Sequence, residues 1–199
     1  MHSKSLTLIE ALPSPLPRDW ATAPCLDLIN SHWTDHLGTG ETYDRLPEPR
    51  FRRAFLKRWG YRVADADDPG GRARLLTLRT LLRDVLERYI AGRPLPRSMR
   101  MRLESEINRA PVSMRFVSSA NGYTLSAGRE GALWDVVTSD IAMSAATLMS
   151  DKATVKICAN PDCSWMFTDE SKPKTRRWCN VSVCGSLVNV RHHRAARHD

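Results

Sequence analysis

Four of the five cysteines lie in the last quarter of the chain, in two pairs with the same internal spacing. Four residues separate Cys158 from Cys163, fifteen residues follow, and four residues again separate Cys179 from Cys184. Two close pairs joined by an intermediate loop supply the four thiolates that a tetrahedral zinc ion needs. We therefore predict that these side chains bind Zn²⁺. Because four thiolates leave no open position for water or substrate, the predicted role of the metal is structural rather than catalytic.

Other uses of cysteine fit this pattern less well. Two disulfide bonds would require an oxidising compartment. The N-terminus lacks the apolar core of a secretory signal, so we expect a cytoplasmic protein with reduced thiols. A redox dithiol is typically a C-x-x-C pair, and the sequence contains none. Cys25 stands apart in a short apolar segment and is interpreted as a small buried hydrophobic residue.

Positive charge is concentrated beside these cysteines. The chain has a net charge of +8, and the segment from residue 171 to the C-terminus contributes +6 of it. Arginines spaced three apart on a helix can meet DNA phosphates, so we predict that DNA is a partner. A solvated helix face, or cations that offset the charge of four thiolates, would have the same composition. The predicted DNA-binding residues are Lys172, Lys174, Arg176, Arg177, Arg191, Arg194 and Arg197.

Short elements are expected to position the cysteines. Residues 154–158 and 164–167 favour two extended strands that flank the first pair. After the second pair the pattern predicts a terminal helix that packs Leu187 and Val190 on the zinc core and exposes its arginines. Gly185 is expected to let the backbone close tightly around the metal. A tail this small buries little surface, so metal binding is expected to contribute much of its stability.

The chain before this tail is predicted to be mainly helical. Apolar side chains recur at helical spacing in residues 49–59, 72–91, 98–109 and 130–150. Between the last two segments the spacing changes to two from Val112, and Asn121 with Gly122 favours a tight turn, which predicts a β-hairpin. We interpret all of these apolar stripes as core packing. The polar segment 150–154 is the predicted boundary between domains at 1–150 and 151–199.

The expected fold class is therefore α+β. It combines a mainly helical N-terminal domain containing a β-hairpin with a small C-terminal four-cysteine finger made of a strand pair and a terminal helix. No run of 18 or more apolar residues is present, so no membrane-spanning helix is expected.

Polar and aromatic groups near the start of the chain are candidates for a small-molecule site. Asp27, Asn30 and Trp33 lie in or just after the segment "CLDLIN". These residues are expected to line a pocket for an effector. The alternative interpretation is that Asp27 and Asn30 cap helices and make turns.

The segment "CANPDCSWMFTDESKPKTRRWCNVSVCG" resembles the CGNR zinc finger of bacterial transcription regulators. The resemblance is carried by the two C-x4-C pairs, by "RRWC" and by the glycine after the last cysteine. The upstream chain resembles ABATE, a stress-induced transcription regulator domain, through "CLDLIN" and the long helices. The family is named for Cys-Gly-Asn-Arg, whereas this chain has Ser186 and Leu187 after Cys184 and Gly185. Any contact that the Asn and Arg make with DNA is therefore missing here.

The resemblance implies a zinc-dependent DNA-binding transcription regulator. Its finger would contact DNA, and its N-terminal domain would sense a small-molecule effector or form a homodimer. The alternative is a zinc-stabilised adaptor whose basic surface meets an acidic protein. The sequence contains no G-x-G-x-x-G, Walker A, H-E-x-x-H or G-x-S-x-G motif, so we expect no enzymatic activity.

Overall fold

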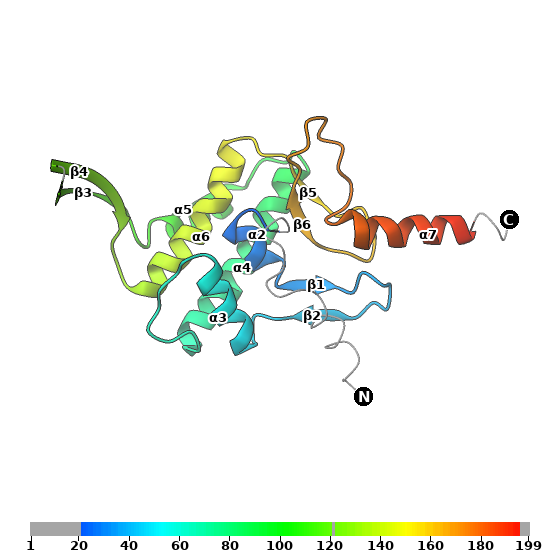
Figure 1. The fold of residues 1–199 in the computed structure, drawn as a ribbon, viewed down its shortest axis with the longest axis horizontal. Helices are drawn as coiled ribbons and strands as arrows, with labels where there is room; N and C mark the ends of the chain where they lie inside the picture. Colours follow the sequence, from blue (N-terminus) through cyan, green and yellow to red (C-terminus); the bar gives the residue numbers. More distant parts are fainter. Residues whose placement is uncertain (1–20, 121, 196–199) are drawn as a thin grey trace. The chain divides into compact units, whose positions relative to one another are not determined.

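The computed structural model describes residues 21–120 and 122–195, without the side chains of His192, Arg194 and Ala195 (Figure 1). The chain divides into two compact units. The finger unit contains the chain up to Asp44 together with the chain from Thr154 onward. The helical unit is Arg45–Ala153. The segment before residue 45 thus shares a compact unit with the cysteines, while the predicted domain boundary near residue 151 stays a prediction.

Four helices form the helical unit, as their apolar spacing predicted. They are α3 (Pro49–Arg58), α4 (Pro69–Ile90), α5 (Arg97–Ile107) and α6 (Leu133–Ser150) (Figure 1). Proline is the first helical residue of α3 and α4, where its missing N–H costs nothing. The leucines of α4, the phenylalanines of α3 and the small residues of α6 are buried together. The expected mainly helical domain is therefore confirmed.

Gly71 permits the close approach of α4 to α6. A Cβ atom at this position would lie 2.1 Å from the Trp134 ring, which is far inside van der Waals contact. The carboxylate of Asp68 accepts a 2.6 Å hydrogen bond from the Gly71 N–H and caps the start of α4. The first turn of α4 is thus fixed by a cap on one side and by an indole ring on the other.

The predicted β-hairpin is present, but its apolar residues are not in the core. Strand β3 (Val112–Ser119) pairs antiparallel with β4 (Gly122–Arg129) over all eight residues, with Ser119 opposite Gly122. Asn121 of the predicted turn lies outside the described residues. Val112, Met114 and Phe116 are 54%, 59% and 72% exposed, so the interpretation of their alternation as core packing is wrong. The hairpin extends away from the helices of its own unit, and none of them covers it (Figure 1).

The finger unit is assembled from two distant parts of the chain. Its first part is helix α2 (Pro24–Ile29) followed by strands β1 (His32–Thr34) and β2 (Thr42–Asp44). Its second part is strands β5 (Val155–Ile157) and β6 (Met166–Thr168), the π-helix η2 (Val181–Gly185) and helix α7 (Ser186–Ala195). The predicted strand pair and terminal helix of the finger are both confirmed. Cys25 is fully buried in α2, as expected for a small hydrophobic residue.

Helix α7 packs on the finger through a different residue from the one expected. Val188 is 8% exposed, whereas Val190 is 47% exposed. The sequence-based choice of Val190 is therefore wrong. The π-helix η2 directly precedes α7, and no sequence pattern predicted this element. Within the described residues, no helix combines the length and the low polarity needed to cross a membrane.

Candidate metal centre and nucleic-acid interface

The four C-terminal cysteines converge on one point. Cys158 directly follows β5, Cys163 lies in the next turn, Cys179 precedes η2, and Cys184 lies within it. All four side chains are buried, and their Sγ atoms lie within 4.8 Å of one another. The Sγ atom of Cys179 is 3.8 Å from that of Cys163 and 3.6 Å from that of Cys184. The predicted clustering of these residues is thus present, although they are 26 positions apart at the extremes of the segment.

This geometry fits a tetrahedral zinc ion. With a Zn–S distance of about 2.3 Å, the sulfur atoms at the corners of a regular tetrahedron are about 3.8 Å apart. The two Sγ–Sγ distances from Cys179 agree with that edge. A bound zinc ion would supply a cross-link between the two cysteine pairs and the positive charge that four thiolates need. The arrangement is thus that of a zinc-type structural centre.

The pKa values of the four thiols also indicate that the cluster would bind a cation. A hydrogen bond with Cys158 raises the pKa of Cys163, and hydrogen bonding with Cys158 likewise raises the pKa of Cys179. The pKa of Cys158 is lowered, chiefly because Cys163 donates to its sulfur. The pKa of Cys184 is lowered as well, so two of the sulfurs carry negative charge at the expense of the other two. A divalent ion removes this competition, because it stabilises all four thiolates at once.

Asn160 connects the metal centre to the first part of the finger unit. Its side chain is fully buried. The Nδ2 group donates a 3.0 Å hydrogen bond to the backbone oxygen of His36 and also lies 3.8 Å from the Cys184 Sγ atom. The Oδ1 atom accepts from the backbone N–H of Asp162 and so shapes the turn between Cys158 and Cys163. Sequence reasoning assigned this segment only to a turn and missed the role of Asn160.

Asn30 makes the second connection between the two parts. Its amide donates a 2.8 Å hydrogen bond to the backbone oxygen of Met166 and accepts a 2.9 Å bond from the Met166 N–H. The side chain thus pairs with β6 as a neighbouring strand would. Nearby, the backbone N–H of Thr34 donates to the Ser164 hydroxyl. Strand β6 is therefore held by β5 on one edge and by the α2–β1 segment through these contacts.

The residues predicted to bind an effector lie in the interior of the finger unit. Asp27 and Trp33 are 5% and 8% exposed, and the Trp33 ring stacks on Tyr43 at a centroid distance of 5.3 Å. Both hydrogen-bonding ends of the Asn30 amide are occupied by Met166. The structure thus places these three side chains in contacts within the unit, and a ligand-binding role for them stays a prediction.

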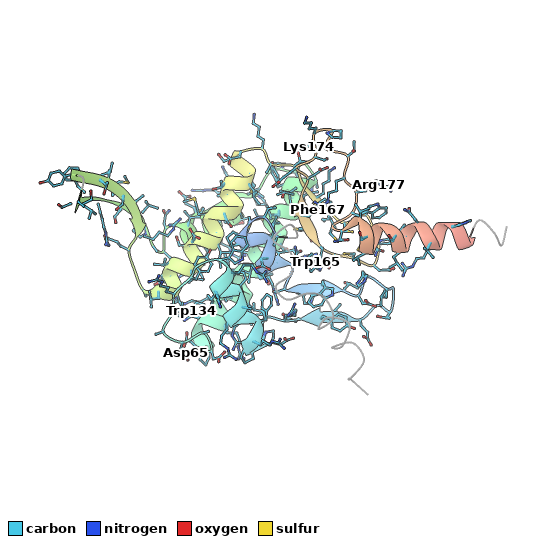
Figure 2. The ribbon with its side chains drawn as sticks, viewed as in Figure 1. Asp65, Trp134, Trp165, Phe167, Lys174 and Arg177 are labelled. Carbon is cyan, nitrogen blue, oxygen red and sulfur yellow. The ribbon has the colours of Figure 1, made fainter. Side chains whose placement is uncertain are left out.

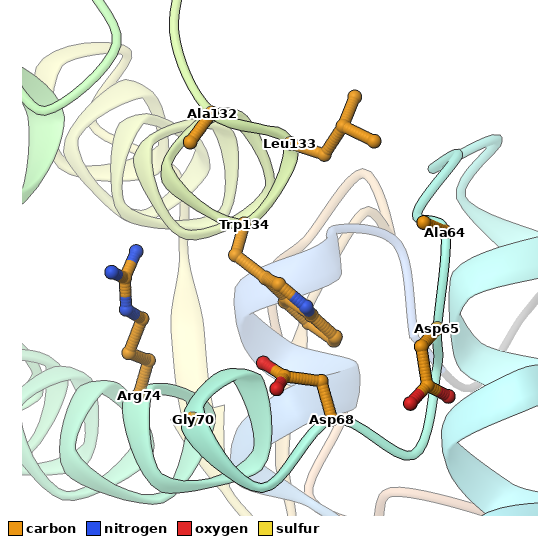
Figure 3. Close-up of a pocket in the computed structure, with 8 residues that line it drawn as sticks. All are labelled: Ala64, Asp65, Asp68, Gly70, Arg74, Ala132, Leu133 and Trp134. Atoms are coloured by element: carbon orange, nitrogen blue, oxygen red, sulfur yellow. The ribbon is translucent and has the colours of Figure 1, made fainter.

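A separate pocket of about 370 Å³ lies in the helical unit (Figure 3). It contains none of the three residues predicted to bind an effector. Its polar groups already have partners: Arg74 pairs with Asp135, and Asp68 caps α4. The pocket therefore offers a ligand few free polar groups. Its lining residues are Ala64, Asp65, Asp68, Gly70, Arg74, Ala132, Leu133 and Trp134.

The loop between β6 and Cys179 carries four of the predicted DNA-binding cations. Lys172, Lys174 and Arg177 are exposed, and Figure 2 shows Lys174 and Arg177 on this loop. The guanidinium of Arg177 lies 5.1 Å from the centre of the Trp178 ring. Arg176 is half-buried instead: it stacks 4.7 Å above Phe167 and donates to the backbone oxygens of Trp178 and Cys179.

A buried carboxylate organises this loop. Asp169 is 1% exposed and accepts hydrogen bonds from the Lys156 ammonium, from Ser171 and from the Arg176 backbone N–H. Burial acts to raise the pKa of Asp169, but the hydrogen bonds from Lys156 and Ser171 hold it well below its ordinary value. The charge of Asp169 thus fixes the backbone from which the exposed cations project. No sequence motif marked this residue.

Of the three DNA-binding cations predicted from Arg191 onward, only Arg191 has a side chain that the structure describes. Arg191 forms a 2.5 Å ion pair with Asp162 and donates to the backbone oxygen of Leu37, so it ties α7 to the first cysteine turn. The side chain of Arg194 and the whole of Arg197 lie outside the described residues. Gly185, the last residue of η2, lies against the Trp178 ring, which a Cβ atom there would meet at 2.9 Å. The absence of a side chain at Gly185 thus lets the Trp178 ring pack against the backbone beside the metal centre. The expectation that Gly185 lets the backbone close around the metal stays a prediction.

A helical unit joined to a four-cysteine finger defines a protein of the zinc-finger type. Residues 154–197 match the family model described as "CGNR zinc finger". Residues 22–152 match ABATE, described as "Putative stress-induced transcription regulator", and this match covers more than half of the chain. The chain therefore belongs to the ABATE family, with a CGNR finger at its C-terminus. Both are regulator or zinc-finger types rather than enzyme families. No curated protein matches the chain.

Proposed function

We propose that this protein is a DNA-binding transcription regulator whose finger is held together by one Zn²⁺ ion. Cys158, Cys163, Cys179 and Cys184 are its proposed ligands, because their sulfur atoms form a buried cluster of tetrahedral size. The observation that carries the DNA-binding proposal is the row of exposed cations on the loop between the two cysteine pairs. Family membership supports the regulator class.

The cations divide by their contacts into two proposed roles. Lys172, Lys174 and Arg177 are exposed on the loop, where a phosphate backbone can reach them. Arg176 and Arg191 are half-buried and hydrogen-bonded within the finger unit, so we assign them to positioning the loop and α7. The Lys174 ammonium donates a 2.8 Å hydrogen bond to the Asp169 backbone oxygen, and its other two N–H groups are the ones proposed to meet phosphate. Arg194 and Arg197 follow on the same C-terminal segment and are proposed as further phosphate contacts.

Fluorescence anisotropy with a labelled random DNA duplex at several salt concentrations tests this proposal. If about four cations meet phosphates, the logarithm of affinity falls with the logarithm of salt with a slope of roughly −3.6. Lys172→Ala combined with Arg177→Ala is expected to weaken binding and to reduce the magnitude of the slope by about 1.8. The matched control is Lys57→Ala with Arg62→Ala, which removes the same two residue types from exposed positions of the helical unit.

Three results would count against DNA binding by the loop. They are the absence of binding at micromolar protein, an affinity that salt does not change, and a control pair that weakens binding as much as the loop pair. The first result, together with capture of an acidic protein by the same loop, would favour the zinc-stabilised adaptor instead.

Metal analysis of the purified full-length chain tests the zinc centre separately. We expect one zinc ion per chain, and we expect Cys163→Ser to lose it. Cys25→Ala is the matched control, because Cys25 is equally buried but lies in α2, outside the cluster. Removal of zinc by a chelator is expected to abolish salt-dependent DNA binding, because the loop loses its anchor at both ends. Equal metal content in the two variants would refute the ligand assignment.

A further inference from the structure

The β3–β4 hairpin exposes a continuous apolar face. Residues two apart on a strand share a face, and the observed register places Phe116 opposite Leu125 and Met114 opposite Ala127. The rings of Phe116 and Tyr123 stack in parallel, with centroids 4.9 Å apart. Phe116, Tyr123 and Leu125 are 72%, 71% and 65% exposed. The apolar residues of this side are Val112, Met114, Phe116, Tyr123, Leu125 and Ala127, which we call the hairpin apolar face; Ser118 and Arg129 lie on the same side, at its two ends.

The opposite face of the hairpin is polar. It presents Ser113, Arg115 and Thr124, with Val117 as its one large apolar residue among those described. Arg115 pairs with Glu130 at 3.0 Å on this side. The hairpin is therefore amphipathic, with its apolar side uncovered and its charged side toward water. A hairpin with water on both faces would have no need to gather its apolar side chains on one of them.

The hairpin also lacks the usual protection of an exposed sheet. Among the described residues it is a two-stranded sheet, so each strand has an outer edge without a strand partner. Pairing runs through all eight positions without a bulge, and neither strand contains proline or lysine. Natural sheets normally use bulges, proline or lysine to prevent association at such surfaces. Their absence favours a surface that associates.

The size of the hairpin apolar face matches what a dimer needs. An aromatic side chain can bury about 150–250 Å². Two rings that are more than two-thirds exposed therefore leave roughly 300 Å² uncovered. With its aliphatic side chains the face offers roughly 600 Å² per copy, and two copies would bury roughly 1,200 Å², the lower end of specific interfaces. The one charged residue among those described on this side, Arg129, lies opposite Val112 at the base of the hairpin, where its guanidinium donates to the Ala110 backbone oxygen and to Ser139. The exposed part of the face therefore bears no free charge and complements itself better than it complements a charged partner.

We propose that a second copy of this chain covers the hairpin apolar face, so that two hairpins pack face to face about a two-fold axis. Phe116 and Tyr123 of each copy lie at the centre of this interface, and the Arg115–Glu130 pairs lie outside it. Such an isologous contact is closed and stops at the dimer. The inference goes beyond the proposed DNA binding and does not depend on it.

Sedimentation equilibrium of the full-length, zinc-loaded chain at roughly 1–100 µM tests the proposal. We expect a mass that rises toward twice the monomer value of 22.5 kDa. Phe116→Ser combined with Leu125→Ser is expected to raise the dimer dissociation constant at least about 100-fold, because large apolar groups leave the centre of the interface. The matched control, Val117→Ser, changes one apolar residue on the opposite face of the same strand and is expected to leave the mass unchanged.

Circular dichroism distinguishes loss of the interface from loss of the fold. The helical signal of the Phe116, Leu125 double variant is expected to equal that of the wild type, since both positions are exposed. A monomeric wild type overturns the proposal. If that monomer also loses thermal stability in the double variant, the face is covered within the chain by residues outside the described ranges. A dimer that survives the double variant, or that Val117→Ser disperses equally, also overturns it.

Discussion

Replacing Asn30 with alanine is expected to loosen the joint between the two parts of the finger unit. The Asn30 amide makes two buried hydrogen bonds to the backbone of Met166, at 2.8 and 2.9 Å. Each such bond contributes a net of about 1 kcal/mol, and leaving the Met166 N–H buried without a partner adds about 1–3 kcal/mol. The expected loss is therefore about 3–5 kcal/mol in the free energy of unfolding. The α2 cap is unaffected, because the backbone N–H of Asn30, not its side chain, makes that contact.

The assay is urea denaturation at a fixed concentration of free zinc, because bound metal itself adds to stability. Tryptophan fluorescence reports the transition, since Trp33 and Trp165 flank the joint. The rate at which zinc passes to a chromogenic chelator provides a second measurement. This transfer is expected to be faster in the variant, because β6 leads directly into the loop that ends at Cys179. Asn189→Ala, at an exposed position of α7, is the matched control and is expected to change stability by less than about 0.5 kcal/mol. Equal stability of the Asn30 variant and this control would refute the reasoning.

Three further predictions concern single side chains. Arg52 is 2% exposed and donates to three backbone oxygens, so Arg52→Ala is expected to cost about 2–4 kcal/mol in thermal unfolding. Its neighbour Arg53 pairs with the same carboxylate from an exposed position, and Arg53→Ala is expected to cost less than about 0.5 kcal/mol. Similar costs would contradict this assignment. Gly71→Ala is expected to cost about 2–3 kcal/mol, because its Cβ atom would overlap the Trp134 ring, and an unchanged melting temperature would show that the ring can move. Asp169 has a lowered pKa in the folded state, so it stabilises the fold above its unfolded pKa of about 3.9, and this contribution is lost as pH falls through the folded value. The free energies of unfolding of the wild type and of Asp169→Asn, measured by circular dichroism at a series of pH values, should therefore differ at neutral pH and converge in acid. A difference that does not change with pH would contradict the prediction.

The sequence was informative where the signal is local. Helical spacing of apolar residues identified α3, α4, α5 and α6, because the period of a helix is repeated within a few turns. Two cysteine pairs with equal spacing predicted the cluster, because a metal centre imposes short spacings on the residues that converge on it. The strand pair β5–β6 followed from its position around the first cysteine pair.

The errors and omissions arise where distant residues decide the outcome. Alternation along β3 and β4 showed that the hairpin has an apolar side, but period alone does not show what covers that side. Asn30 pairs with a backbone 136 residues away, and no spacing rule connects the two positions. Val188 rather than Val190 is the packed valine of α7, and the spacing of apolar residues in so short a segment did not distinguish the two positions. No sequence pattern marked the roles of Asn160 and Asp169, because a single buried polar side chain leaves no periodic signal in the sequence.

The division of the finger unit between the two ends of the chain affects how the protein is made on the ribosome. Asn30 leaves the ribosome long before Met166, its hydrogen-bonding partner 136 residues further on. At about 5–20 residues per second, the α2–β1 segment waits roughly 7–27 s for β6. The helical unit between them is contiguous and can fold during that interval. The finger unit, and the metal centre proposed for it, can therefore be completed only after the helical unit has been synthesised.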